Sequence, residues 1–88
     1  MVQASISAKK RQMPRYYFQL QADGHDAADK EGIEFVDLPT ARDHARRALA
    51  DILRDEVAEG SDIVALAIAI HDAAGYRVAK ISAVLTIA

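Results

Sequence analysis

Cysteine is absent from this 88-residue sequence, and so are long apolar runs. Without thiols the chain has neither a disulfide framework nor thiolate ligands for zinc. Its most apolar run, residues 63–70, is far shorter than a membrane-spanning helix. The first residues contain no apolar segment of the kind found in signal peptides. We therefore expect a cytoplasmic protein that does not contact a membrane.

Large apolar side chains are also few. Tryptophan is missing, aromatic residues make up 6% of the chain, and 18 of its 45 apolar residues are alanine. The 27 larger apolar side chains suffice for one sheet-and-helix layer but not for two cores. Because a domain of this size buries a modest share of its surface, binding to a partner chain would add stability.

Charge is small in sum but unevenly placed. The net charge is −2, residues 1–15 contain four cations and no acid, and residues 23–34 contain five acids and one lysine. We predict a flexible basic extension over residues 1–12 and a single small domain over residues 13–88. Because that domain is acidic, nucleic acid is not expected as a partner. If the chain did bind nucleic acid, the candidates would be Lys9, Lys10, Arg11 and Arg15.

Alternation and turn residues predict an α+β fold in the order β-β-α-β-β. Residues 15–21, 33–36, 63–70 and 76–87 read as strands. Asp37 is the expected N-cap of a helix that ends near residue 59, before Gly60. The expected architecture is an antiparallel sheet of about four strands with one long helix packed on one face.

The last two strands are expected to form the central hairpin. Asp72 and Gly75 suit the first and last positions of a type I turn. The simplest register pairs Ile70 with Val78 and Val64 with Val84, which gives one alanine-rich face and one face of larger side chains. The helix is expected to pack on the alanine-rich face. The other face is the candidate self-association surface, and its residues are Val64, Leu66, Ile68, Ile70, Val78 and Val84.

A helix can cover one face of the sheet only, so we expect self-association through the remaining face or through an edge. A homodimer is the first expectation for this homo-oligomer, with an unidentified protein as a further partner.

Recognisable catalytic and ligand-binding motifs are missing. His25, His44 and His71 lie in two connections and the helix, which is no metal-ligand spacing. The sequence has no cysteine nucleophile, no serine motif and no glycine-rich phosphate loop. We expect no catalytic, cofactor-binding or metal-binding residues, no cofactor and no enzymatic activity.

Four short segments of the chain carry motifs, at residues 13–18, 23–24, 29–35 and 72–75. Taken together, they resemble those of a family of small uncharacterised bacterial proteins. Its members open with Met-Pro-Arg-Tyr-Phe-Phe and continue with Asp-Gly, Asp-x-Glu-Gly-x-Glu-Leu and Asp-x-x-Gly. This chain has Tyr17 in place of a Phe and Phe35 in place of the Leu. This resemblance, to a domain of unknown function, implies a fold and no activity.

A more distant analogy is to HicB-like antitoxins, which share the strand-strand-helix-strand order and an acidic entry to the helix. Our prediction from the sequence is a non-enzymatic, self-associating interaction or regulatory module. The alternatives are a HicB-like, antitoxin-type protein that binds a small toxin partner, and a nucleic-acid binder that uses the basic arm.

Overall fold

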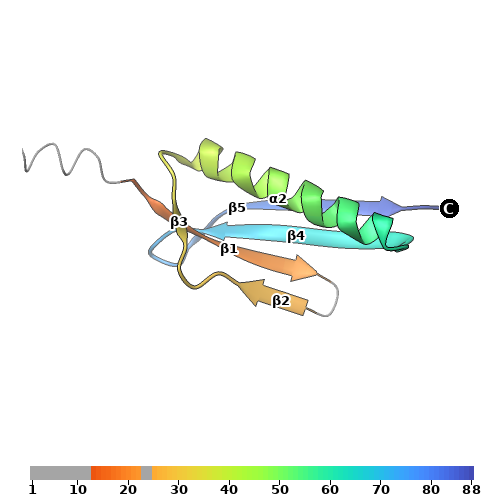
Figure 1. Cartoon of the computed structure of the whole chain (residues 1–88). Coiled ribbons are helices and arrows are strands. Elements are labelled where there is room, and N and C mark those ends of the chain that lie inside the picture. Colours follow the sequence, from red (N-terminus) through yellow and green to blue (C-terminus); the bar gives the residue numbers. More distant parts are fainter. Residues whose placement is uncertain (1–12, 23–24) are drawn as a thin grey trace, which may run out of the picture.

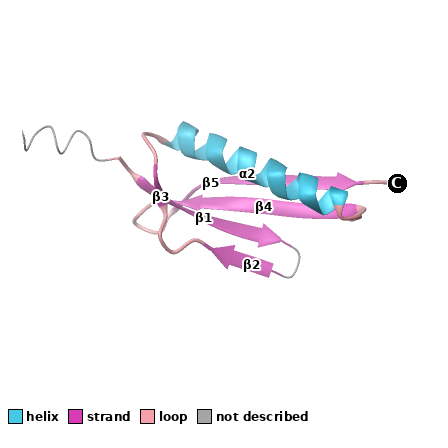
Figure 2. Cartoon of the chain, viewed as in Figure 1, coloured by secondary structure: helices cyan, strands magenta, loops and turns pink. Residues whose placement is uncertain are grey.

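The computed structural model describes residues 13–22 and 25–88, so the predicted basic extension over residues 1–12 lies outside the described residues. It contains one antiparallel sheet with helix α2 on one side (Figures 1 and 2). The elements are β1 (Arg15–Ala22), β2 (His25–Ala28), β3 (Ile33–Glu34), α2 (Leu38–Ala58), β4 (Ile63–His71) and β5 (Arg77–Thr86). The predicted α+β class and the order of its elements are confirmed.

Four strands lie side by side in the order β2-β1-β4-β5, and the two-residue β3 pairs with the start of β1. The sequence prediction missed β2, because its His-Asp-Ala-Ala sequence has no apolar alternation and lies in a polar stretch. Gln19 to Ala22 of β1 pair with Ala28 to His25, which makes β2 one edge of the sheet. β5 forms the opposite edge.

Helix α2 begins and ends where its capping residues predict. The Asp37 side chain accepts a hydrogen bond from the Thr40 N–H at 3.0 Å, and Gly60 has φ = 105° just after the C-cap, Glu59. An ion pair joins Asp43 and Arg47 at 3.0 Å on the solvent side. In residues 13–22 and 25–88, no helix combines the length and apolar character needed to cross a membrane.

The core lies between α2 and the face of the sheet with the larger side chains. Ala41, Ala45 and Leu49 of α2 are buried, and they pack with buried side chains of β1 and β4. This corrects the expectation that α2 covers the alanine-rich face of the hairpin. Burial of Leu and Ile side chains removes more apolar surface from water than burial of alanines, at about 25 cal/mol per Å². The alternating side chains of β4 that meet α2 are Val64, Leu66, Ile68 and Ile70.

The β4–β5 register differs by one residue from the predicted one. The turn forms as predicted: the Gly75 N–H donates to the Asp72 carbonyl at 3.0 Å, and Gly75 has φ = 94°. His71 then pairs with Arg77 but Ile70 pairs with Ala79, so Val78 is an extra residue at a β-bulge. Beyond the bulge, Ala79, Ile81 and Ala83 face α2. Lys80, Ser82 and Val84 therefore lie on the open face.

Candidate functional site

The structure does not present the six predicted self-association residues as one surface. Four of them lie on β4 beneath α2, and Ile70 has no exposed surface. The bulge separates Val78 from this group, and Val84 lies on the opposite, open face, where it is 74% exposed. Helix α2 therefore covers the face that was expected to be open, and the alanine-rich face is the one that stays open. Self-association itself stays a prediction.

The outer edge of β5 is an unpaired backbone edge among the described strands. The Ile87 N–H donates to the Asp62 carbonyl at 2.7 Å, so Ile87 directs its backbone groups toward β4. Because backbone groups alternate in direction along an antiparallel strand, Leu85, Ala83 and Ile81 also point inward. The residues between them therefore direct their N–H and C=O groups away from the sheet. These are Lys80, Ser82, Val84 and Thr86.

An apolar groove accompanies this edge on the helix side of the sheet. It lies between α2 and the end of β5 and has a volume of about 420 Å³. Leu53 and Val57 are half-buried in its wall, and Leu85 lies opposite them. Ala50, Arg54 and Ala58 complete this β5-side groove.

A second groove lies on the other flank of α2. Helix α2 packs mainly on β4 and β5, and β1 and β2 extend beyond it (Figure 1). A hollow of about 320 Å³ lies there. Its floor consists of Phe18 and Leu20 of β1 and Ala27 of β2. Its wall consists of Ala48 and Ile52 of α2. The hollow continues past Leu20 and Ile52 to Ala22, Glu56 and Ile63.

Aromatic rings lie at the other end of this hollow. The centroid of the His44 ring is 5.3 Å from that of Phe18 and 5.2 Å from that of Phe35. We call the whole depression the β1-side groove.

The two flanks of α2 differ in charge. Helical spacing places Asp51, Asp55 and Glu59 on the flank of Ala48 and Ile52. It places three arginines and one acid on the flank of Ala50 and Leu53, which are Arg42, Arg46, Arg54 and Asp43. Asp51 and Arg54 form an ion pair at 3.3 Å across the solvent side. Asp55 and Glu59 form no ion pair with any described residue. The flank beside the β1-side groove is therefore acidic, and the flank beside the β5-side groove is mixed with an excess of arginine.

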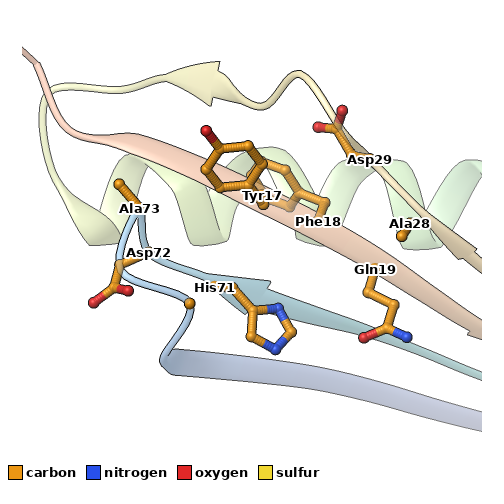
Figure 3. A pocket seen from close by; sticks show the side chains of 9 residues that line it. Tyr17, Phe18, Gln19, Ala28, Asp29, His71, Asp72 and Ala73 are labelled. Carbon is orange, nitrogen blue, oxygen red and sulfur yellow. The ribbon is translucent and has the colours of Figure 1, made fainter.

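A hollow of about 250 Å³ lies at the end of the sheet near the β4–β5 turn (Figure 3). Tyr17, Gln19 and His71 line it together with Asp29 and Asp72. The Asp29 carboxylate accepts the backbone N–H groups of Glu31 and Gly32 at 3.0 and 3.1 Å. The Asp72 carboxylate accepts those of Ala74 and Tyr76 at 3.0 and 2.9 Å. Each of these carboxylates thus holds its own loop in shape.

The described part of the chain contains no cluster of three histidine or acidic side chains that could hold a metal ion.

Of the four cations considered for nucleic-acid binding, only Arg15 lies in the described residues. Its guanidinium donates to the Glu34 carboxylate at 3.0 Å and to the Glu31 carbonyl at 2.8 Å, so it holds β3 and its loop against β1. Lys9, Lys10 and Arg11 lie outside the described residues. Tyr16 and Phe18 of the same strand face α2.

Comparison with protein-family models matches residues 15–84 to DUF6894, a domain of unknown function. The match covers every described strand except the last residues of β5. The chain belongs to this family. This agrees with the resemblance to a family without known activity, and the DUF6894 match starts at the first residue of β1. No curated protein and no solved structure matched the chain.

The sequence did not reveal either groove, because each depends on where α2 lies across the sheet. A signal for the charge of the β1 flank was present, since Asp51, Asp55 and Glu59 recur at four-residue spacing.

Proposed function

We propose that this protein is a non-enzymatic interaction module that self-associates as a twofold dimer through β5. The observation that carries the proposal is the ten-residue edge strand β5, whose outer backbone groups have no partner among the described strands. A long, regular edge is a template for strand addition unless it is shortened, charged or covered. Only two of the ten residues of β5 are charged, Arg77 and Lys80, so most of this edge has no charge to prevent strand addition.

Antiparallel pairing of β5 with its copy satisfies the outward backbone groups. A twofold axis at Ala83 pairs Ser82 with the copy's Val84, and Lys80 with its Thr86. All four residues direct their N–H and C=O groups outward. Each hydrogen bond gained in this way contributes about 0.5–1.5 kcal/mol net. The two sheets then form one continuous sheet.

The same operation brings the two β5-side grooves together. Helix α2 lies over β4 and β5, and strands are spaced by about 4.8 Å, so the two copies of α2 would lie about 10 Å apart. Packed helices are separated by about 8–10 Å. Leu53, Val57 and Leu85 of each copy would fill the groove of the other, which removes an apolar hollow from water on both sides.

A role without catalysis is supported by the hollow in Figure 3. Its two carboxylates, on Asp29 and Asp72, already accept backbone hydrogen bonds within their loops. General acid or base catalysis needs a carboxyl group positioned on a substrate, with a pKa adjusted by burial or by neighbouring charge.

Sedimentation equilibrium of the full chain over a range of concentrations tests the dimer. Ser82→Pro removes an outward N–H and leaves the β4 ladder intact, and edge positions tolerate proline. Ala50→Lys places a second cation, beside Arg54, among the residues that line the β5-side groove. We expect a dimer for the wild-type chain and weakening of at least about tenfold for each variant.

The charge-matched control is Ala74→Lys, an exposed turn position outside both grooves flanking α2. It should sediment like the wild-type chain. Far-ultraviolet circular dichroism checks that each variant is folded. A wild-type monomer at every concentration would refute the proposal, as would folded Ser82→Pro and Ala50→Lys variants with unchanged dimerisation.

A further inference from the structure

The sheet is wider than the single helix that covers it. Four strands spaced by about 4.8 Å offer room for two helices about 10 Å apart on one face. Helix α2 occupies the place over β4 and β5. The place over β1 and β2 is the β1-side groove, where Phe18, Leu20 and Ala27 form an apolar floor. The shape and chemistry of the floor thus fit the apolar side of one more helix.

The charges around the β1-side groove determine what kind of helix can bind there. Glu56 of α2 lines the far end of the groove. Helical spacing places Asp55 and Glu59 on the same flank of α2, where neither has an ion-pair partner among the described residues. Asp29 lies on the β2 side. Neither wall contributes a lysine or an arginine among the described residues that line it. A helix lying here would extend the side chains of one flank toward the carboxylates of α2, so lysines or arginines at those positions gain favourable interactions.

A second copy of this chain is a poor occupant. Its described helix, α2, already covers its own core, and the flank next to its own groove is acidic. In a twofold arrangement through this groove, acid would face acid with no arginine between them, which opposes binding. On the β5 flank, in contrast, Asp43 lies among the arginines.

We infer that the β1-side groove binds a basic amphipathic helix of another protein, which lies beside α2 and completes the helical layer over β1 and β2. Leucine-type side chains of that helix contact Phe18, Leu20 and Ile52, and its cations face Asp55 and Glu59. This is helix-in-groove recognition, in which anchors at positions i, i+3, i+4 and i+7 provide the apolar contact. The inference does not depend on dimerisation through β5, because the two grooves lie on opposite flanks of α2.

A labelled peptide tests the inference by fluorescence anisotropy with the full chain. The probe is a helical peptide of about 18 residues, long enough to span the roughly 26 Å of β1, with leucines on one face and lysines on the other. One control peptide contains glutamate in place of lysine. A second has the same composition in an order that destroys the apolar face. We expect binding of the first peptide only.

Position within the groove is tested by paired alanine-to-lysine variants of equal charge. Ala27 is exposed on β2 and lies on the groove floor, so Ala27→Lys should weaken binding of the basic peptide by at least about tenfold. Ala50→Lys on the opposite flank and Ala74→Lys in the turn should leave binding within about twofold of the wild-type value.

Amide chemical shifts provide a second measurement that does not rely on variants. The peptide should perturb β1, β2 and the Ala48–Ile52 region, and leave the outer edge of β5 unchanged. The inference would be overturned if the basic amphipathic peptide did not bind, or if the scrambled peptide bound equally well. It would also be overturned if Ala27→Lys and Ala50→Lys weakened binding to the same extent. The Ala27→Lys variant should still dimerise, so failure of this inference can be distinguished from failure of the proposed dimer.

Discussion

At the scale of single residues, Gly32 is the position where the backbone leaves least room for a side chain. It has φ = 74°, and a Cβ atom there would lie 2.8 Å from Arg15 Cγ, 2.9 Å from Tyr17 Cε2 and 3.0 Å from the Tyr16 carbonyl oxygen. Arg15 in turn holds this loop through its hydrogen bond to the Glu31 carbonyl. The loop that connects β2 to β3 therefore depends on glycine for both conformation and space.

We predict that Gly32→Ala destabilises the fold more than Gly60→Ala does. Gly60 also has a positive φ, 105°, but a Cβ atom added there would have no neighbour within 4 Å among the described residues. Gly60→Ala should cost about 1–2 kcal/mol for backbone strain alone. Gly32→Ala should cost about 1–3 kcal/mol more, because Arg15 and Tyr17 must also move. Urea unfolding of the two variants measures the difference, and equal losses would contradict the prediction.

At the scale of elements, the ends of α2 and the turn at 72–75 were predictable from the sequence, because each depends on local residues. Asp37 and Gly60 bound the helix, and Asp72 and Gly75 make the turn, as their side chains and conformational preferences require. Strand β2 was not predictable in this way. Its pairing is set by β1, which lies beside it, and its own residues have no strand pattern.

The register of β5 was not predictable because both of its alternating residue sets contain apolar side chains. One set has Val78 and Val84, and the other has Ile81 and Leu85. Alternation fixes register only where one set is clearly polar. The bulge at Val78 selects the second set for the core. As a result, the residues predicted to form the association face were wrong. The candidate site consists instead of the outer edge of β5, the β5-side groove and the β1-side groove.

The N-terminus of α2 should make stability depend on pH in the acid range. Hydrogen bonds from the Thr40 hydroxyl and then the Thr40 N–H lower the pKa of Asp37 below its ordinary value of 3.8. A lowered pKa means that the ionised cap stabilises the fold above the ordinary value, and that this contribution is lost as pH falls through the lowered one. Asp37→Ala should therefore lower the melting temperature at neutral pH by several degrees.

The difference in melting temperature between the wild-type chain and Asp37→Ala should shrink as the pH falls below 3.8, and should be smallest once the pH is below the lowered pKa at which the folded Asp37 is protonated. Thermal melts followed by circular dichroism over a pH series measure this. Asp37→Asn, which keeps an oxygen that can cap the helix but does not titrate, is the control. A difference that stays constant down to the lowest pH would contradict a role for the charge of Asp37.

At the scale of the whole molecule, α2 divides the helix side of the sheet into two surfaces that differ in charge. The β1 flank has Asp51, Asp55 and Glu59, whereas the β5 flank has Arg42, Arg46 and Arg54 together with Asp43. A net charge of −2 hides this separation. Self-association on one flank leaves the other facing outward, so each chain of a dimer would keep its β1-side groove free for another protein.

Independence of the two flanks predicts a complex of two chains and two basic peptides. Sedimentation velocity with saturating peptide should give this mass, with no loss of dimer. Raising the salt concentration from about 50 to 500 mM should release the peptide, because ion pairs at an exposed rim are screened. The dimer should persist, since β5 pairing depends on backbone hydrogen bonds and apolar contact, and its facing arginines repel less in salt. Dissociation of the dimer when the peptide binds would contradict this prediction. So would dissociation of the dimer at a lower salt concentration than dissociation of the peptide.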